Sequence, residues 1–196
     1  MTTRTSSARS DVLEMLKEDH KRLKKAFRDF ARLDPERDVK ACRQLVDRSC
    51  SDLELHARLE EELFYPAARG GMDEPELIEE AEVEHASAKS LIQQLRSMSA
   101  EDPKFAATFT VLGEYVKHHI KEEEGELFEK LSRARVEWED LLDEMTERRL
   151  ELENEMGVAA GEDHAGHEEA ESEHVETEVS PAARAGRHES NRKAAR

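Results

Sequence analysis

Hydrophobic residues recur every three or four positions through most of the chain, which is the spacing of an amphipathic α-helix. The first such stripe contains Leu13, Leu16, Leu23, Phe27 and Phe30. Three similar stripes follow, and turn residues rich in glycine, proline and aspartate separate them. The pattern predicts four long helices at 10–33, 36–68, 73–97 and 103–131, with Ser10 as the N-cap of the first.

Short turns between long helices favour antiparallel neighbours, so we expect an all-α, up-down-up-down four-helix bundle. A weaker stripe at 136–156 predicts a shorter fifth helix that packs against the bundle. The bundle domain therefore covers 10–156. The polar segment 1–9 is expected to be a disordered leader.

After Gly157 the helical periodicity ends. Residues 161–179 are rich in glutamate and histidine, and 184–196 are basic. Too little apolar surface is present to offset the entropy of ordering, so we expect 157–196 to be a disordered tail, first acidic and His-rich and then basic. The tail histidines are interpreted as part of a solvated charged segment, and the tail is the expected contact for a protein partner.

Composition narrows the function classes. The formal net charge is −17, which argues against nucleic acid because phosphate binding needs clustered Lys and Arg. No apolar run approaches the ~20 residues of a membrane span, and the leader lacks the apolar stretch of a secretory signal. We expect a soluble, cytoplasmic protein. Cys42 and Cys50 share one predicted helix about 12 Å apart, too far to bridge.

Each predicted bundle helix carries one histidine within its apolar stripe. His20 lies between Leu16 and Leu23, and the other three occupy similar places. They are His56, His85 and His119. A single inward histidine is usually a satisfied core residue. In an antiparallel bundle, however, successive helices return these residues to similar heights, so the pattern predicts that all four converge on one cavity.

Two of these histidines are followed four residues later by a glutamate, as His56 with Glu60 and His119 with Glu123. This HxxxE spacing puts an imidazole and a carboxylate side by side, able to bind one metal ion or bridge two. A buried ionised carboxylate is very costly unless it is paired or coordinated. We therefore expect a dinuclear metal site. A core whose histidines and glutamates only hydrogen-bond one another is the alternative.

The doublet His118-His119 leaves two pairings open on the fourth helix. The segments that follow His56 and His119 are similar in sequence, and aligning them pairs His119 with Glu123. The alternative pairs His118 with Glu122, which lies on the outward face if the first pairing holds.

The order of these motifs resembles the hemerythrin-like cation-binding (HHE) family: a histidine, an HxxxE pair, a histidine and a second HxxxE pair. The resemblance covers residues 11–131, and 138–152 is similar to the extra helix common in bacterial members. It implies two iron ions as the cofactor. It also implies four terminal histidine ligands and two bridging carboxylates, which are His20, His56, His85, His119, Glu60 and Glu123.

One departure from the oxygen-carrying hemerythrins changes the expected function. The carriers have HxxxH on the third helix, whereas Lys89 stands four residues after His85. The missing imidazole argues against simple oxygen carriage and leaves a coordination position for O2, peroxide or NO. We expect sensing, stress protection or detoxification, with peroxide decomposition or oxidase-type chemistry as the enzymatic version. A non-catalytic iron sensor or buffer is the alternative.

Competing assignments fit the sequence less well. A ferritin-type site needs two Glu-x-x-His pairs, and only Glu82 with His85 has that spacing. Zinc and manganese are the competing metals, but a dinuclear set of histidines and bridging carboxylates matches iron better. Tyr65 and Tyr115 are expected to pack between helices rather than to serve the site.

Overall fold

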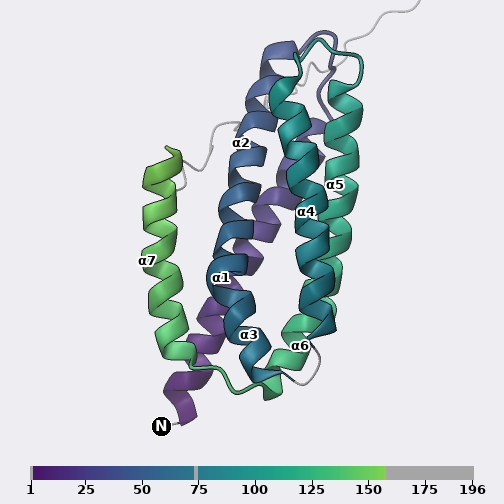
Figure 1. Ribbon diagram of the computed structural model, residues 1–196. Coiled ribbons are helices and arrows are strands. Elements are labelled where there is room, and N and C mark those ends of the chain that lie inside the picture. The colour runs from purple at the N-terminus through teal and green to yellow at the C-terminus, as the bar shows by residue number, and fades with distance from the viewer. Residues whose placement is uncertain (1, 73–74, 158–196) are drawn as a thin grey trace, which may run out of the picture. The chain divides into compact units, whose positions relative to one another are not determined.

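The computed structural model describes residues 2–72 and 75–157, and this part of the chain contains helices and no strands, which confirms the predicted fold class. Four long helical segments run up and down beside one another (Figure 1). In chain order, the elements are α1 (Thr2–Phe30), α2 (Val39–Leu59), the π-helical turn η1 (Glu60–Phe64), α3 (Tyr65–Gly71), α4 (Glu76–Ser97), α5 (Phe105–Glu122), the π-helical turn η2 (Glu123–Leu127), α6 (Phe128–Lys130), the short 3-10 turn η3 (Leu131–Arg133) and α7 (Trp138–Met156). No described helix is long and apolar enough to cross a lipid bilayer.

Helix α1 covers most of the segment 1–9, so the expectation of a disordered leader ending at an N-cap Ser10 was wrong. Ala8 is buried in the hydrophobic core, and Arg9 donates a hydrogen bond from Nη1 to the carbonyl oxygen of Ser132 over 3.3 Å. Such tertiary contacts stabilise polar turns whose intrinsic helix propensity is low. Periodicity alone therefore placed the start of the helix too late.

The second and fourth bundle helices each contain a π-helical turn at a corresponding place. Glu60 begins η1 and Glu123 begins η2, so each turn starts at the glutamate of an HxxxE pair. A π turn contains one more residue than an α turn and rotates the side chains that follow it, and such turns are frequent at functional sites. The apolar pattern predicted uninterrupted helices here and gave no sign of this rotation.

Two hydrophobic clusters fill the bundle, and a polar layer lies between them. One cluster includes Leu16 and Leu59, and the other includes Leu23, Leu53 and Phe109. The buried residues of the layer are His20, His56, Glu60, His85, His119 and Glu123. Because apolar side chains pack on both sides of it, the layer is shielded from bulk water along the bundle axis.

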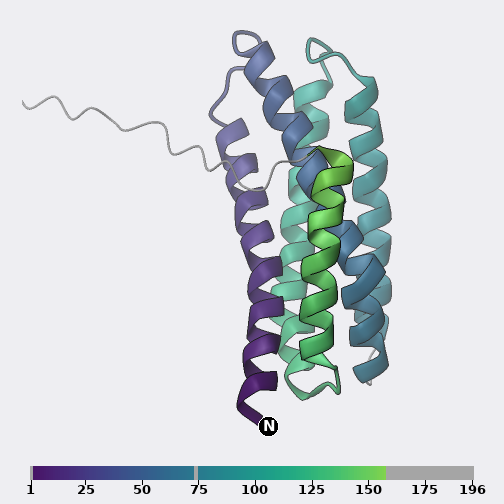
Figure 2. The same ribbon diagram turned by 90° about the vertical axis from the view of Figure 1, so that its left-hand side faces the viewer.

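Helix α7 lies outside the four-helix bundle and packs against α1 and α2, as the stripe at 136–156 predicts (Figure 2). Trp138, Leu141, Met145 and Leu152 are its buried residues. The helix ends at Gly157, whose φ of 64° is left-handed and favours glycine. The rest of the predicted disordered tail lies outside the described residues.

The two cysteines, Cys42 and Cys50, are free and buried on α2, in line with the helical spacing that separates them. Burial raises the pKa of the Cys50 thiol to about 12. The thiolate is the reactive form of cysteine, so this side chain is unreactive at neutral pH.

Candidate metal centre

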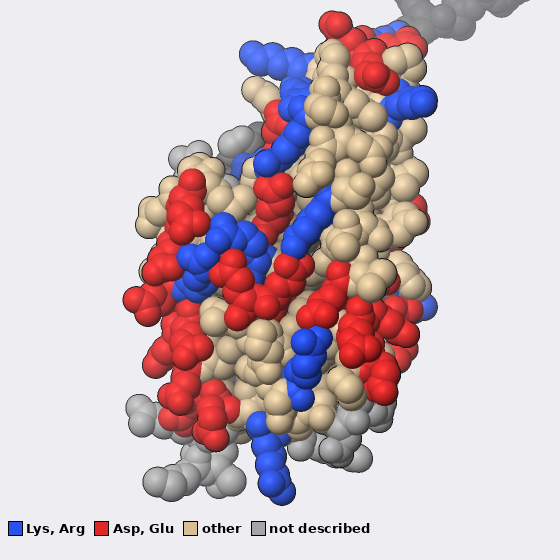
Figure 3. Space-filling view, in the orientation of Figure 1, with Lys and Arg blue, Asp and Glu red and all other residues tan. Residues whose placement is uncertain are grey.

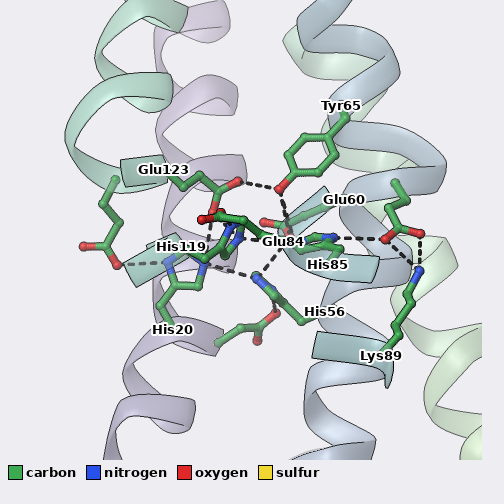
Figure 4. A network of polar contacts seen from close by, with 12 residues as sticks. His20, His56, Glu60, Tyr65, Glu84, His85, Lys89, His119 and Glu123 are labelled. Carbon is green, nitrogen blue, oxygen red and sulfur yellow. Dashed lines mark hydrogen bonds and ion pairs between the residues drawn. The ribbon is translucent and has the colours of Figure 1, made fainter. Parts of the chain in front are cut away.

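Four histidines from four different helices meet in the buried polar layer (Figure 4). The Nε2 atoms of His20 on α1 and His56 on α2 lie 3.1 Å apart. Those of His85 on α4 and His119 on α5 lie 3.2 Å apart. None of the four is more than 6% exposed. Paired ring nitrogens at this separation are the donor arrangement that binds a transition-metal ion.

The two HxxxE glutamates lie between the histidine pairs. Glu60 Oε2 is 3.2 Å from His56 Nε2 and 3.3 Å from His85 Nε2, so it contacts one histidine of each pair. Glu123 Oε2 is 3.1 Å and 3.9 Å from the Nε2 atoms of the other two. Each carboxylate is therefore placed where it can bridge two metal ions.

All six residues singled out by the sequence come together in this layer. Their candidate ligand atoms form two overlapping groups, the first with His20, His56, Glu60 and Glu123 and the second with Glu60, His85 and His119. Glu60 Oε1 and Glu123 Oε2 are buried and accept no hydrogen bond from the described residues. Buried oxygens without a donor are rare in folded proteins, and a bound cation is a common reason for them.

The bundle has two halves, one formed by α1, α2 and η1 and the other by α4, α5 and η2. The second residue of each π turn contacts a histidine of the opposite half. His20 Nδ1 lies 2.9 Å from Glu124 Oε1, and His85 Nδ1 lies 3.0 Å from Glu61 Oε1. A carboxylate on Nδ1 keeps the proton on that nitrogen and leaves Nε2 free to bind a metal ion. The rotation that η1 and η2 introduce thus brings two consecutive glutamates to the site.

The remaining two histidines are held by acidic residues from the neighbouring helix. His119 Nδ1 lies 2.9 Å from Glu84 Oε2, and His56 Nδ1 lies 3.4 Å from Asp19 Oδ2. Each of the four imidazoles therefore presents Nε2 to the layer and Nδ1 to a carboxylate. Sequence reasoning missed these outer carboxylates, although an acidic residue directly precedes His20 and His85 and directly follows each HxxxE pair.

The two halves of the bundle carry the same motif, so the site is pseudo-symmetric. The matching segments are Asp19-His20 with Lys24 on α1 and Glu84-His85 with Lys89 on α4. Lys24 Nζ lies 3.0 Å from Glu124 Oε1, and Lys89 Nζ lies 2.7 Å from Glu61 Oε1. Lys89 thus pairs with the outer carboxylate of Glu61. The position four residues after His85 is therefore occupied by this ammonium group and not by an imidazole.

An aromatic pair breaks the symmetry. The Tyr65 hydroxyl lies 3.3 Å from Glu123 Oε1 and 3.4 Å from Glu60 Oε2, and it donates toward these two carboxylates. The equivalent residue of the other half is Phe128, whose ring stacks on His20 with centroids 6.2 Å apart. Tyr65 is buried, as expected for a residue that packs between helices. Its hydroxyl also contacts the central carboxylates, and the sequence-based expectation did not include this contact.

Burial and charge shift the pKa values of the two central glutamates in opposite directions. Burial, together with the charge of Glu123, raises the pKa of Glu60 well above its ordinary value. Burial also disfavours the ionised form of Glu123, but the close contact with the His20 imidazole and the charge of His119 lower its pKa to about 2. Glu60 therefore keeps its proton more readily than an ordinary glutamate does, and a bound cation would take the place of that proton.

A cavity connects the second histidine pair with the surface. It has a volume of about 30 Å³ and is lined mostly by leucine, alanine, valine and isoleucine side chains. Its polar lining residues are His56, His85, His119, Glu54, Glu84, Lys89 and Tyr115. Tyr115 is 50% exposed, so it stands at the surface rather than in a helix interface as expected. One water needs roughly 10–15 Å³, so the cavity admits a molecule of two or three heavy atoms.

His118 faces outward. Its side chain is 61% exposed, and its Nε2 atom lies 3.1 Å from Glu122 Oε1. The structure therefore places His119, and not its neighbour, in the buried layer. Glu84 joins this pair in a third group, in which only His118 is fully exposed, and Glu84 and Glu122 also line a small opening together with Glu123.

Comparison with known proteins agrees with this geometry. The family model for the hemerythrin HHE cation-binding domain matches residues 11–131. The chain belongs to the hemerythrin HHE cation-binding family. It is therefore a cation-binding protein, and the buried layer is the candidate centre of this HHE domain.

Two relatives of this HHE domain show how far the likeness extends. The crystal structure of an HHE cation-binding domain-containing protein from Mycobacterium kansasii matches with a TM-score of 0.62 at 23% identity, over 72% of this chain and 86% of that one. This likeness is one of fold. A protein named DNA nickase from Nostoc sp. (strain PCC 7120 / SAG 25.82 / UTEX 2576) is 27% identical over 121 residues, 60% of this chain. The chain spans only 32% of the length of that protein.

Proposed function

We propose that this chain is a non-haem di-iron protein that binds O2 or a related small ligand, peroxide or NO, for sensing, stress protection or detoxification. The proposed ligands are His20, His56, Glu60, His85, His119 and Glu123. The observation that carries the proposal is the convergence of four imidazole Nε2 atoms on two buried carboxylates that each keep an oxygen without a hydrogen-bond donor. A purely structural polar core is penalised for such atoms.

The donor set favours iron over its competitors. One ion would be held by His20 and His56 and the other by His85 and His119, with Glu60 and Glu123 between them. Imidazole and carboxylate ligands together suit iron, and manganese or zinc would fit less well. When bound, iron supplies reversible electron transfer and a coordination position for a small ligand.

The protein's own groups prepare the site for this chemistry. The outer carboxylates hold the Nδ1 protons and so keep each Nε2 lone pair directed at the centre. The Tyr65 hydroxyl is a hydrogen-bond donor within reach of both central carboxylates. The two hydrophobic clusters exclude bulk water along the bundle axis.

The size and lining of the cavity beside His85 and His119 support a small ligand. A volume of about 30 Å³ with mostly apolar walls admits O2, NO or hydrogen peroxide and excludes metabolites of ordinary size. The partly exposed polar groups of the lining are Glu54, Glu84, Lys89 and Tyr115.

A second candidate function is an iron sensor or buffer without catalysis. Its support is that the proposed ligands come from all four bundle helices, so metal binding would tie these helices together. A ligand that binds only the folded state raises stability by mass action, and iron-dependent folding would be the signal.

Iron content per chain and the visible absorption spectrum of aerobically purified protein test the proposal. About two irons with ligand-to-metal charge-transfer bands are expected. Both should be lost in His56→Ala and in Glu123→Ala. His118→Ala is the matched control, because this outward neighbour of His119 should leave the iron content unchanged. Metal-free wild-type protein with an intact fold would mean that the layer is a structural polar core.

Two further measurements separate the candidate functions. Consumption of peroxide above free-iron controls supports detoxification, and its absence removes the enzymatic version. A higher melting temperature and slower proteolysis after iron loading support the sensor. Equal melting and equal cleavage patterns with and without iron remove that alternative.

The proposed partner is a small ligand, and we propose neither a nucleic-acid nor a membrane partner. The net charge of −17 supports the first exclusion, because it disfavours a phosphate backbone. The Nostoc relative is named DNA nickase, but the match covers only 32% of that protein's length. The activity in that name belongs to the longer protein. A cytoplasmic location and a protein contact through the tail remain proposals, tested by fractionation and by comparing pull-downs with and without residues 158–196.

A further inference from the structure

The outer carboxylate of one histidine is held from outside the four-helix bundle. Arg149 of α7 donates a hydrogen bond from Nη2 to Asp19 Oδ2, and Arg22 of α1 donates to Oδ1 of the same carboxylate. Asp19 is only 3% exposed. The oxygen that Arg149 contacts also lies 3.4 Å from His56 Nδ1. A continuous series of contacts thus leads from α7 to a proposed metal ligand.

The equivalent carboxylate in the other half of the bundle is held differently. Among the described residues, Glu84 forms its ion pairs with the imidazoles of His118 and His119. Helix α7 packs on α1 and α2, and Glu84 belongs to α4, on the other side of the bundle (Figure 1). In addition to the difference between Tyr65 and Phe128, the contact of α7 with Asp19 therefore makes the two proposed metal positions unequal.

We propose that Arg149 is a positioning residue for His56, so that the docking of α7 sets the metal affinity of the position formed by His20 and His56. This inference rests on the dinuclear site proposed above. A guanidinium on Oδ2 keeps the Asp19 carboxylate turned into the bundle, where it holds the Nδ1 proton of His56. Without that guanidinium, the partly exposed Arg22 is the arginine that still contacts Asp19 within the described part of the chain, and the carboxylate is free to turn outward.

The neighbouring arginine on α7 makes contacts of another kind. Arg148 Nε lies 2.7 Å from Glu62 Oε2, and its Nη1 lies 2.7 Å from Glu151 Oε2. These pairs lie at the surface, where basic and acidic side chains alternate over α7 and α2 (Figure 3). Arg148 contributes to the docking of α7 but contacts none of the proposed ligands or their outer carboxylates. It is therefore a matched control for Arg149.

The test is an anaerobic titration of the full chain with Fe²⁺, in the wild type and in Arg149→Gln, Arg149→Lys and Arg148→Gln. The wild type and Arg148→Gln should bind both ions with unchanged affinity. In Arg149→Gln one of the two ions should bind about tenfold more weakly or worse, because loss of outer support at a metal site typically costs 10–100-fold in affinity. Arg149→Lys should recover part of the loss.

Two readouts without metal show that positioning, and not folding, is affected. Trp138 is the single tryptophan of the chain and is buried at the start of α7, so its fluorescence reports whether α7 is docked. In NMR spectra of metal-free protein, the hydrogen-bonded Nδ1 proton of His56 should disappear in Arg149→Gln but persist in Arg148→Gln.

Asp19→Asn breaks the same series of contacts from the other end. If Arg149 acts through Asp19, the double variant should bind no more weakly than the weaker single variant. Additive losses would overturn the proposal, as would an Arg149→Gln protein that binds both ions as tightly as Arg148→Gln. A wild-type chain that binds fewer than two ions would instead contradict the proposed function, so the two failures are distinguishable.

Discussion

Asp19 and Glu84 occupy equivalent positions: each directly precedes a histidine on its own helix and accepts a hydrogen bond from the Nδ1 atom of the histidine on the next helix. The duplication in this chain therefore includes the groups that orient the proposed ligands as well as the ligands. Variants at matching positions of the two halves should have matching effects, except where Tyr65 and α7 break the symmetry.

The outer carboxylates of the π turns give the first prediction. Glu61→Gln and Glu124→Gln should each weaken metal binding by about 10–100-fold, because each removes the negative charge from the Nδ1 side of one histidine. Equilibrium dialysis against Fe²⁺ measures the effect. Glu122→Gln is the control, since its partner His118 is exposed. Wild-type affinity in either of the first two variants would contradict the prediction.

Glu60→Gln should raise the stability of the metal-free protein and abolish binding of the metal pair. In the folded state Glu60 keeps its proton at pH values above its ordinary pKa of 4.5. In the unfolded chain the same carboxyl group has released its proton at these pH values. The free energy of unfolding of the metal-free wild type therefore decreases as the pH rises above about 4.5, and the neutral amide removes this contribution. The variant should be more stable than the wild type at pH 8 by about 1–3 kcal/mol and should bind no metal pair.

Urea unfolding of metal-free protein at pH 5 and pH 8, with metal content beside it, measures both effects. The advantage of the variant should be larger at pH 8 than at pH 5. A metal-free variant that is less stable than the wild type at pH 8 would show that Glu60 is a satisfied structural residue.

Tyr65→Phe should preserve the fold and change the electronic environment of the site. The ring stays buried, and only the hydroxyl near Glu60 and Glu123 is lost, so the two ions should still bind with less than about tenfold change in affinity. The charge-transfer bands of the iron-loaded protein should shift, because the carboxylates lose a hydrogen-bond donor. An unchanged spectrum would place the hydroxyl outside the working site.

Gly113→Ala should destabilise the hydrophobic cluster that contains Leu23, Leu53 and Phe109. A Cβ atom at Gly113 would lie 2.8 Å from Cδ1 of Phe27, whose ring packs against Phe109 with centroids 5.0 Å apart. The rigid ring cannot yield without disturbing its neighbours, so a loss of about 1–3 kcal/mol is expected in urea unfolding. Gly70→Ala, which meets no atom within 4 Å, should be neutral or stabilise by up to about 1 kcal/mol.

The amphipathic pattern predicted the fold class, the antiparallel helices and the fifth helix, because side chains that share a helix face are fixed by local geometry. It failed at the N-terminus. The helix continues through residues 2–9 because Ala8 and Arg9 contact segments distant in the sequence. It also gave no indication of η1 and η2.

The sequence by itself determined which six residues face the interior at one height, since helical periodicity and short turns are enough to bring His20, His56 and their partners to one layer. Tertiary structure alone decided what surrounds them. Asp19 and Arg149 lie 130 positions apart in the chain, and no local pattern relates them. The Tyr65 hydroxyl and the outer carboxylates likewise reach the site only after four helices pack and two π turns rotate their side chains, because those contacts depend on the relative placement of whole helices.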